Sequence, residues 1–484
     1  MKQIGRKIKE YAASFLFFWI FLVVPLFFEN KYFNILEAKG HVYVVGAIAA
    51  CIFMLVGFVL EKSVGELLPE SGNILDLGIV LFGVIALISC LLSGSVWESF
   101  WGLSGWRVGA FTFATFTLFY RFLASNLKYR QNLWIPVLLV NVVIFLFGIF
   151  HSMGVDILGM HEYINPKEFY SYISTIGNLN WFVGYLCLTV PLVTVFYLSS
   201  ESVFSRNICL VFLIPAVLNM VLCGSDGLYL GIGVCAFFAV PYIMGEGKRI
   251  QRIFVLMCLY GCALLIVGIC PFFSEKVVSI KGISAVFLRL PVTVGIIVIG
   301  IAGLILARRF GDQISEKTQR RITVLLELLL ILTAAVFLWD MIMNFNDSWG
   351  TERGRTWRYS LNLFRNFSVK DKLLGVGPEM LRSYYAELTD YFSRKILVAH
   401  SEPLQILLTT GIAGFLCWIV IWGSVIGLYL KKSLWKHEAI AFVLPLAAYL
   451  GQSLVNSPQT TNVAILCVMF ACFRLHTKEE KISP

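Results

Sequence analysis

The sequence alternates between long apolar runs and short polar connections along its whole length. A helix of about 20 apolar residues spans the hydrocarbon core of a bilayer. Fourteen runs fit this description, so the pattern predicts an all-α, polytopic bundle of about 12–14 transmembrane helices. Their expected limits are 12–28, 41–60, 75–93, 109–124, 133–151, 181–199, 207–223, 228–244, 253–272, 290–307, 322–343, 403–430, 438–455 and 462–474.

The composition agrees with a membrane protein and excludes a soluble enzyme. Hydrophobic residues make up 58% of the chain and charged residues only 14%, whereas soluble domains carry about a quarter charged residues. The 12 cysteines lie in or beside apolar runs, which indicates neither a disulfide framework nor a zinc site. We therefore expect no metal and no cofactor.

The formal net charge of +10 reflects membrane orientation more than nucleic-acid binding. With the N-terminus placed in the cytoplasm, the basic short connections and the C-terminal tail all fall on the cytoplasmic side, as the positive-inside rule requires. The chain also contains no glycine-rich nucleotide loop, which argues against a pump driven by ATP. The connections that decide the orientation contain Lys128 and Arg130; Lys248, Arg249 and Arg252; Arg308, Arg309, Lys317, Arg320 and Arg321; and Lys431, Lys432 and Lys436.

One long polar segment interrupts this pattern and divides the chain into three parts. Residues 1–343 contain the first eleven spans, residues 344–402 form an extracytoplasmic loop, and residues 403–484 contain the last spans and a cytoplasmic tail. Only this loop is large and polar enough to hold a reaction. We therefore expect it to carry the catalytic residues.

The first half of the loop predicts an amphipathic helix over residues 354–368. On a helix, Arg355, Arg358, Asn362 and Arg365 share one face, opposite an apolar face that includes Trp357. Arginine suits phosphate because its planar fork donates paired hydrogen bonds and keeps its charge. An equally open interpretation is an interfacial helix that lies on anionic lipid headgroups.

Histidine and glutamate close the loop just before the next span. His400 is a candidate general base, because the ordinary pKa of histidine is near neutral pH. Glu402 is close enough in sequence to orient its imidazole. A single loop histidine is commonly an ordinary surface residue, and its proximity to the arginines is what makes His400 a candidate. His151 and His161 flank another external loop, with nothing to place them near these arginines.

Several of these segments together resemble the O-antigen ligase/polymerase family. The resemblance covers roughly residues 89–415 in separate blocks that occur in the family's order. The blocks are Ser99-Phe-Trp-Gly-Leu-Ser-Gly-Trp-Arg107-Val-Gly, Thr175-Ile-Gly-Asn-Leu-Asn180-Trp, Gly354-Arg355-Thr-Trp, Gly375-Val-Gly377, Ala399-His400-Ser-Glu-Pro-Leu-Gln and Thr410-Gly-Ile-Ala-Gly.

The resemblance implies a bacterial membrane glycosyltransferase that acts on glycans carried by undecaprenyl diphosphate. Arg355 and His400 match the family's loop arginine and loop histidine, and are the implied catalytic residues. The implied chemistry is a metal-independent, inverting sugar transfer in which arginines neutralise the diphosphate leaving group and the histidine activates an acceptor hydroxyl. The implied partners are the lipid-linked donor, a glycan or lipid-linked acceptor and membrane lipid. Its place would be the bacterial cytoplasmic membrane.

Further candidate substrate-binding residues come from the spans. Arg107 is a candidate phosphate contact, or else a snorkelling arginine in an aromatic belt. Asn180 and Asp226 are expected at the same membrane face. The turn Ser225-Asp226-Gly227 departs from the Ser-Arg-Gly of many family members. Asp226 is expected to contact an acceptor sugar, to pair with Arg107 or Arg289, or to cap a helix. With Arg358, Arg365 and Glu402, these residues complete the candidate site.

These observations support two classes of function. The first is an enzyme that transfers or polymerises a lipid-linked glycan at the external face. The second is a lipid-linked glycan flippase or another polytopic transporter, which would carry charged residues deep in several spans. By sequence the spans are nearly free of charge and one loop concentrates the polar residues, which favours the enzyme.

Overall fold

The computed structural model describes residues 1–103, 106–386, 398–431 and 438–479, and it is 79% helical. A two-stranded antiparallel hairpin, β1–β2, is the one sheet in these residues. The long helices are α1 (Lys2–Phe18), α3 (Ile35–Glu61), α4 (Ile74–Leu91), α6 (Ala110–Asn126), α7 (Trp134–Ser152), α8 (Leu179–Ser199), α9 (Val203–Leu222), α10 (Asp226–Met244), α11 (Gly247–Ile269), α14 (Leu290–Phe310), α15 (Glu316–Met343), α16 (Trp349–Asn366), α19 (Glu402–Tyr429), α20 (Ile440–Ser453) and α21 (Thr460–Glu479).

The short elements connect the long helices. They are α2 (Val24–Leu26), α5 (Val96–Trp101), β1 (Tyr172–Ile173), β2 (Gly177–Asn178), α12 (Ser274–Ser279), α13 (Gly282–Phe287), α17 (Val369–Leu374) and α18 (Leu381–Ala386).

Each of the fourteen apolar runs forms a helix, so the prediction of an all-α polytopic bundle is confirmed. Twelve of the helices in the described residues are long and apolar enough to cross a membrane. The other two, α6 and α20, have 17 and 14 residues. The chain is a multi-pass membrane protein.

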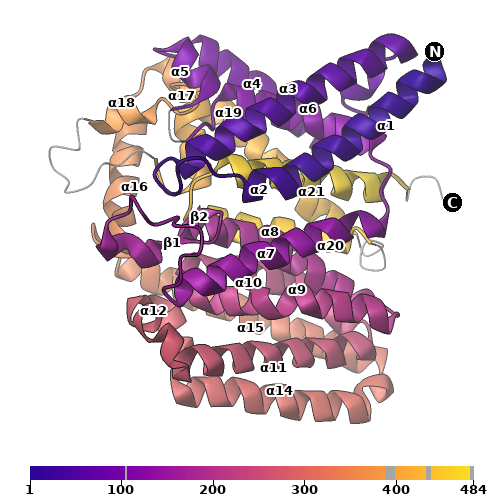
Figure 1. Cartoon of the computed structure of the whole chain (residues 1–484), viewed down its shortest axis with the longest axis vertical. Coiled ribbons are helices and arrows are strands. Elements are labelled where there is room, and N and C mark those ends of the chain that lie inside the picture. Colours follow the sequence, from indigo (N-terminus) through magenta and orange to yellow (C-terminus); the bar gives the residue numbers. More distant parts are fainter. Residues whose placement is uncertain (104–105, 387–397, 432–437, 480–484) are drawn as a thin grey trace.

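The bundle is layered around α8 and α21, which are the most buried of the twelve long spans. In each, 89% of the most apolar window is buried, against 17% for α14 and none for α15. Figure 1 shows α8, α20 and α21 in the middle, α3 and α6 along one side, and α11 and α14 along the other. The inner spans are buried on nearly all sides because they pack among other helices, while the apolar side chains of α15 face outward.

The two ends of the bundle differ. The start of α1 and the end of α21 lie together at one end, and α16, α17 and α18 lie at the opposite end (Figure 1). We call the latter the loop end. The prediction of one long loop was incomplete, because residues 153–178 and 270–289 are also structured there and carry β1, β2, α12 and α13.

A buried ionic cluster lies at the end opposite the loop end. Asp76 accepts from Arg121 at 2.6 Å and from Arg474 at 3.2 Å, and all three side chains are at most 2% exposed. Lys9 is equally buried and pairs with Glu61 at 2.5 Å. The sequence interpretation of charge-poor spans was therefore wrong at this end. These charges are tolerated because each has an ionic partner from a neighbouring element.

Candidate functional site

Helix α16 confirms the helix predicted in the loop, with an irregular start. Gly350, Thr351 and Glu352 have positive φ values, so regular helix begins at Arg353. Arg358 donates to Asp347 at 2.5 Å, and the Nε of Arg355 lies 4.0 Å from the other oxygen of the same carboxylate. Asp347 therefore offsets part of the positive charge of the predicted arginine face. Arg365 is exposed on the same helix.

Among the loop arginines in the described residues, Arg353 reaches furthest into the protein, and the sequence analysis missed it. Its Nε donates to the Val455 carbonyl at 2.9 Å, and its Nη2 donates to the Asn456 side chain at 3.3 Å. Burial lowers the pKa of Arg353, and the nearby carboxylate of Asp226 acts in the opposite direction. Arg353 shares a helical face with Trp357 and Phe364, so an arginine on the apolar stripe was the available signal.

Asp226 lies beside Arg353 and caps a helix. Its Oδ1 accepts from the Ile283 backbone amide at 2.8 Å, at the start of α13. A carboxylate at a helix N-terminus is stabilised by the free amides there. The helix-cap alternative therefore describes the observed contact, although the capped helix is α13 and not Asp226's own α10. The neighbouring cation is Arg353, so the suggested pairing with Arg107 or Arg289 was wrong.

The residue before His400, Ala399, has both its backbone amide and its carbonyl held by side chains. The Ala399 amide donates to the Gln405 side chain at 2.8 Å, and the Ala399 carbonyl accepts from the Trp357 indole at 3.1 Å. His400 itself has a φ of 51°, a left-handed conformation that is uncommon outside glycine. Burial, followed by the positive charge of Arg353, lowers the pKa of His400 to about 4. The imidazole is therefore neutral at pH 7 and can accept a proton.

Glu402 does not orient His400, contrary to the sequence interpretation. Its Oε1 accepts from the Trp418 indole at 3.3 Å, and its Oε2 accepts from the Tyr449 hydroxyl at 2.9 Å. The reversal has a local cause, because α19 begins at Glu402 and turns this side chain into the bundle. Glu402 is 6% exposed, and in the described residues it ties the start of α19 to α20.

Two glycine-containing segments that carry the family resemblance, Gly375-Val-Gly377 and Thr410-Gly411, contact each other through their backbones. Helix α19 breaks at Gly411, where φ is 69° and ψ is −171°, so the expected single span is two helices. The break frees carbonyls that must be satisfied inside the protein. Val376 donates to the Leu408 carbonyl at 3.1 Å and Gly377 donates to the Thr409 carbonyl at 3.0 Å. The Gly375-Val-Gly377 turn thus has a structural role.

The turn fits the break only because both sides lack a side chain. A Cβ atom on Gly375 would lie 2.2 Å from the carbonyl of Thr409, and one on Gly411 would lie 2.4 Å from the carbonyl of Leu373. These distances are far inside van der Waals contact, so the two backbones meet directly.

A polar hairpin between α20 and α21, residues 452–462, connects the blocks of the site. Arg353 binds it at Val455 and Asn456, as described above. Thr460 donates to the carbonyls of Trp106 and Arg107 at 3.2 and 3.3 Å. Asn462 donates to the Trp181 carbonyl at 3.0 Å. The signal for this hairpin was an uncharged run of amides and hydroxyls between two apolar spans, which is typical of a buried polar segment.

Arg107 and Asn180 lie beside this hairpin but use their side chains differently. The Nη2 of Arg107 donates to Glu37 of α3 at 2.8 Å. The Oδ1 of Asn180 accepts from Ser225 at 3.4 Å, so Asn180 contacts the Ser225-Asp226 turn directly, which is closer than the shared membrane face expected from the sequence. The structure therefore brings together Arg353, Asp226, Asn180 and His400 through the hairpin and α16. It leaves Arg358 and Arg365 on the outer surface.

Glu379 is a second residue that the sequence analysis missed. It is 6% exposed and has a φ of 61°. Burial raises the pKa of Glu379 to about 8, and its carboxyl group forms no hydrogen bond with the described part of the chain. Glu379 follows the Gly375-Val-Gly377 turn, which is hydrogen-bonded to α19. A change in its protonation would therefore occur beside the contact between the loop and α19.

His151, Asp156 and His161 form the cluster in the described residues that has the composition of a metal site. Their ligand atoms lie within 4.8 Å of one another. However, the Ser174 amide donates to Nδ1 of His151 at 3.1 Å. An amide donor needs a lone pair on Nδ1, which leaves the proton on Nε2, the atom that faces Asp156. A metal requires the other tautomer, so the observed hydrogen bonds do not fit one.

The chain matches none of the protein-family models against which it was compared, and the search of curated proteins found no similar sequence.

Proposed function

We propose that this protein is a membrane glycosyltransferase of the O-antigen ligase/polymerase type. It would transfer or polymerise an oligosaccharide or polysaccharide carried by undecaprenyl diphosphate, for cell-surface polysaccharide synthesis. The observation that carries the proposal is that Arg353, which binds Val455 and Asn456, lies close enough to His400 for its charge to help lower the pKa of this histidine, at the loop end of a transmembrane bundle. The motif blocks of the sequence support the same class.

The reaction needs a cation for the leaving group and a base for the nucleophile. An acceptor hydroxyl oxygen forms a bond to the anomeric carbon while the bond from that carbon to the diphosphate oxygen breaks. The hydroxyl proton passes to the neutral imidazole of His400. The negative charge that develops on the diphosphate is stabilised by Arg353, with Arg355 nearer the surface, because fixed cations act most strongly where charge develops.

Arg353 and His400 are also coupled electrostatically. The positive charge of Arg353 contributes to the low pKa of His400, so His400 is a weak base while the site is empty. A bound diphosphate would offset that charge and raise the pKa of His400. Donor binding would therefore strengthen the base when the acceptor hydroxyl needs it.

The proposal includes an orientation in the bacterial cytoplasmic membrane. The termini and the basic short connections would face the cytoplasm, and the loop end would face outward. The buried charges at the end opposite the loop end do not favour the transporter alternative. Asp76, Arg121, Arg474 and Lys9 are engaged in ion pairs at that end of the bundle.

Purified protein in liposomes tests the proposal. The probe is an undecaprenyl-diphosphate-linked oligosaccharide, and the readouts are covalent transfer or lengthening of the glycan and its appearance across the bilayer. We expect transfer by the wild type, its loss in His400→Ala and Arg355→Ala, and a reduced but measurable rate in Arg353→Met, in variants that retain a normal elution profile. Wild-type activity in one variant would remove that residue from the site. Translocation of an unchanged substrate would replace the enzyme with a flippase.

A further inference from the structure

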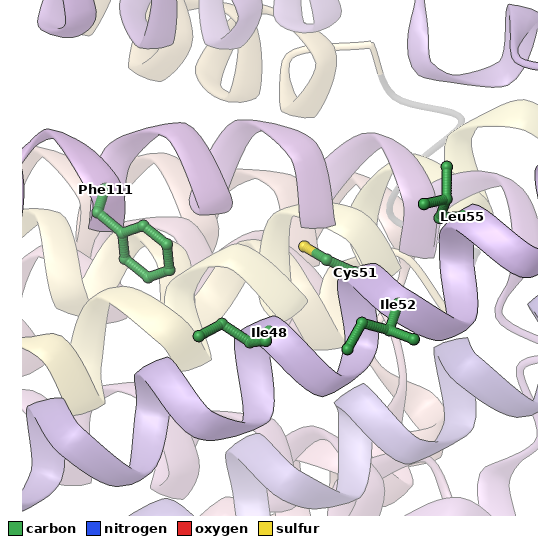
Figure 2. A pocket seen from close by; sticks show the side chains of 5 residues that line it. All are labelled: Ile48, Cys51, Ile52, Leu55 and Phe111. Carbon is green, nitrogen blue, oxygen red and sulfur yellow. The ribbon is translucent and has the colours of Figure 1, made fainter.

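An apolar groove runs along the outside of α3 and is closed at one side by α6. Its volume is about 320 Å3, at the lower end of the range of small-molecule sites. Figure 2 shows the Phe111 ring at one end of the row of lining side chains and Leu55 at the other. The groove opens sideways, because Ile52 and Leu55 are 56% and 64% exposed. The lining residues are Ile48, Cys51, Ile52, Leu55 and Phe111.

Toward the N-terminus of α3, the same helix face becomes polar. At 100° per residue, His41, Val45, Ile48, Ile52 and Leu55 form one stripe along the helix. The C-terminal part of this stripe, from Ile48 to Leu55, lines the groove, and its N-terminal part, at His41, reaches the loop end. A stripe with a polar head and an apolar length of several turns matches an amphiphile that lies along the helix.

Arg107 stands at the polar end of this stripe. Its Nη2 lies 2.8 Å from Glu37 and 3.4 Å from the ring of His41. Its aliphatic stem crosses α3 at Gly40, where a Cβ atom would lie 2.5 Å from the Arg107 side chain. The Nε atom of Arg107 is buried and has no hydrogen-bond partner. That atom is closed off from outside, but the Arg107 side chain as a whole is 26% exposed, so an anionic group beside the groove can approach its guanidinium group.

We propose that the groove holds the isoprenoid chain of the lipid-diphosphate donor, with Arg107 beside its phosphate end. This inference rests on the proposed function. The apolar lining suits a hydrocarbon chain, and the guanidinium above it suits a phosphate. Arg107 lies in the turn just before α6 and Phe111 lies in the first turn of α6, so the phosphate end and the chain of the lipid would meet at the start of this helix.

Continuity with the candidate site favours the donor over a bulk phospholipid. The carbonyl of Arg107 accepts from Thr460, and Thr460 belongs to the polar hairpin that Arg353 binds through Asn456. A diphosphate placed at Arg107 thus lies next to the segment that joins both arginines. A bulk phospholipid would gain nothing from that connection.

A tryptophan that fills the groove tests the proposal, with Ile52→Trp as the test variant and Ile299→Trp as its control. Ile299 is 57% exposed and lies on α14, at the opposite side of the bundle (Figure 1). The probe is undecaprenyl diphosphate, and its binding in nanodiscs of phosphatidylglycerol is measured by native mass spectrometry. Displacing about two methylene groups of chain should weaken binding about tenfold in Ile52→Trp, and the control should bind as the wild type does.

Kinetics separate this proposal from the proposed function. With a glycan-bearing donor, Ile52→Trp should raise KM for the donor about tenfold and keep kcat, because the chain lies away from the reacting atoms. Unchanged binding and KM in Ile52→Trp would overturn the groove proposal while wild-type transfer upholds the function. Equal retention of phosphatidylglycerol and undecaprenyl diphosphate would also overturn it, as an ordinary lipid slot. Binding that depends on Ile52 without any transfer by the wild type would uphold the groove and reject the function.

Discussion

The indole of Trp357 donates a hydrogen bond to the carbonyl of Ala399 at 3.1 Å, so α16 is fastened to the backbone next to His400. The two halves of the loop thereby meet, and the residues that begin and end it belong to one site. Trp357 also packs against Trp349, with ring centroids 5.2 Å apart. The position of His400 therefore depends on a tryptophan that need not touch substrate.

Replacing Trp357 by phenylalanine should weaken this connection without emptying the space. The variant keeps an aromatic ring but loses the N–H donor, and a net hydrogen bond of this kind contributes about 0.5–1.5 kcal/mol. If the hydrogen bond holds His400 in its reactive position, kcat for glycan transfer should fall about threefold to tenfold. Trp349→Phe is the matched control and should keep kcat. Equal rates in both variants would separate Trp357 from the chemistry.

The break in α19 should be intolerant of side chains at Gly411. Gly411→Ala adds a Cβ atom 2.4 Å from the Leu373 carbonyl, at a φ of 69°. With a ψ of −171°, this conformation is essentially confined to glycine and costs another residue about 1–3 kcal/mol, so the melting temperature should fall by several degrees.

Gly423→Ala provides the control within the same helix, because no atom of another element lies within 4 Å of its Cβ position. That variant should melt at or slightly above the wild-type temperature, since alanine favours helix over glycine. A normal melting temperature for Gly411→Ala would mean that the turn and the break do not press together as described.

The sequence was sufficient for the helices and insufficient for the contacts between them. Apolar run length identified all fourteen helices because a bilayer imposes that length on each span. It could not reveal that Asp76 pairs with Arg121 and Arg474, since partners 45 and 398 residues apart are joined only by packing. Such buried charges look like interfacial residues in a linear pattern.

The candidate site shows the same limit at individual residues. His400 was chosen for its chemistry, and the structure gives it a constrained backbone and a charged neighbour. Arg353 was passed over because helix was expected from residue 354, one position too late. The orientation of Glu402 was misjudged because closeness in sequence to His400 did not show that the side chain turns toward Tyr449.

Glu379 should make stability depend on pH in a recognisable direction. Burial raises the pKa of Glu379 from an ordinary value of 4.5 to about 8, so the folded protein holds this proton where the unfolded chain has lost it. The resulting stabilisation is present below pH 4.5 and is lost as pH rises toward 8, by about 1.4 kcal/mol per pH unit within that window.

Glu379→Gln removes the titration, and its melting temperature relative to the wild type should therefore rise between pH 5 and pH 8. The exposed Glu98 supplies the control, since Glu98→Gln should follow the wild type at every pH. A constant difference between Glu379→Gln and the wild type would show that this carboxyl group is not buried as its surroundings indicate.

Zinc should not stabilise the protein through the His151–Asp156–His161 cluster. A ligand that binds only the folded state raises the melting temperature as its concentration passes Kd. The Ser174 amide on Nδ1 of His151 favours a proton on Nε2, and so opposes coordination there. We expect melting temperatures that do not change with added Zn2+. An increase that disappears in Asp156→Asn would instead identify a metal site that binds by displacing the Ser174 hydrogen bond.

The coupling between Arg353 and His400 should appear in the pH dependence of transfer. The acidic limb of kcat/KM reports the base in the free enzyme, and that of kcat reports it in the substrate complex. In the free protein the pKa of His400 is about 4. If the diphosphate offsets Arg353, the limb of kcat should lie at higher pH than the limb of kcat/KM.

Two variants of Arg353 make this prediction specific. Burial is the main cause of the low pKa of His400 and the charge of Arg353 adds to it. Arg353→Met removes that added contribution, so the limb of kcat/KM should move to higher pH and approach that of kcat. Arg353→Lys keeps a positive charge and should retain the separation between the limbs, whatever it does to the absolute rate. Coincident limbs in the wild type, or a separation that survives in Arg353→Met, would show that donor binding does not strengthen His400 through this arginine.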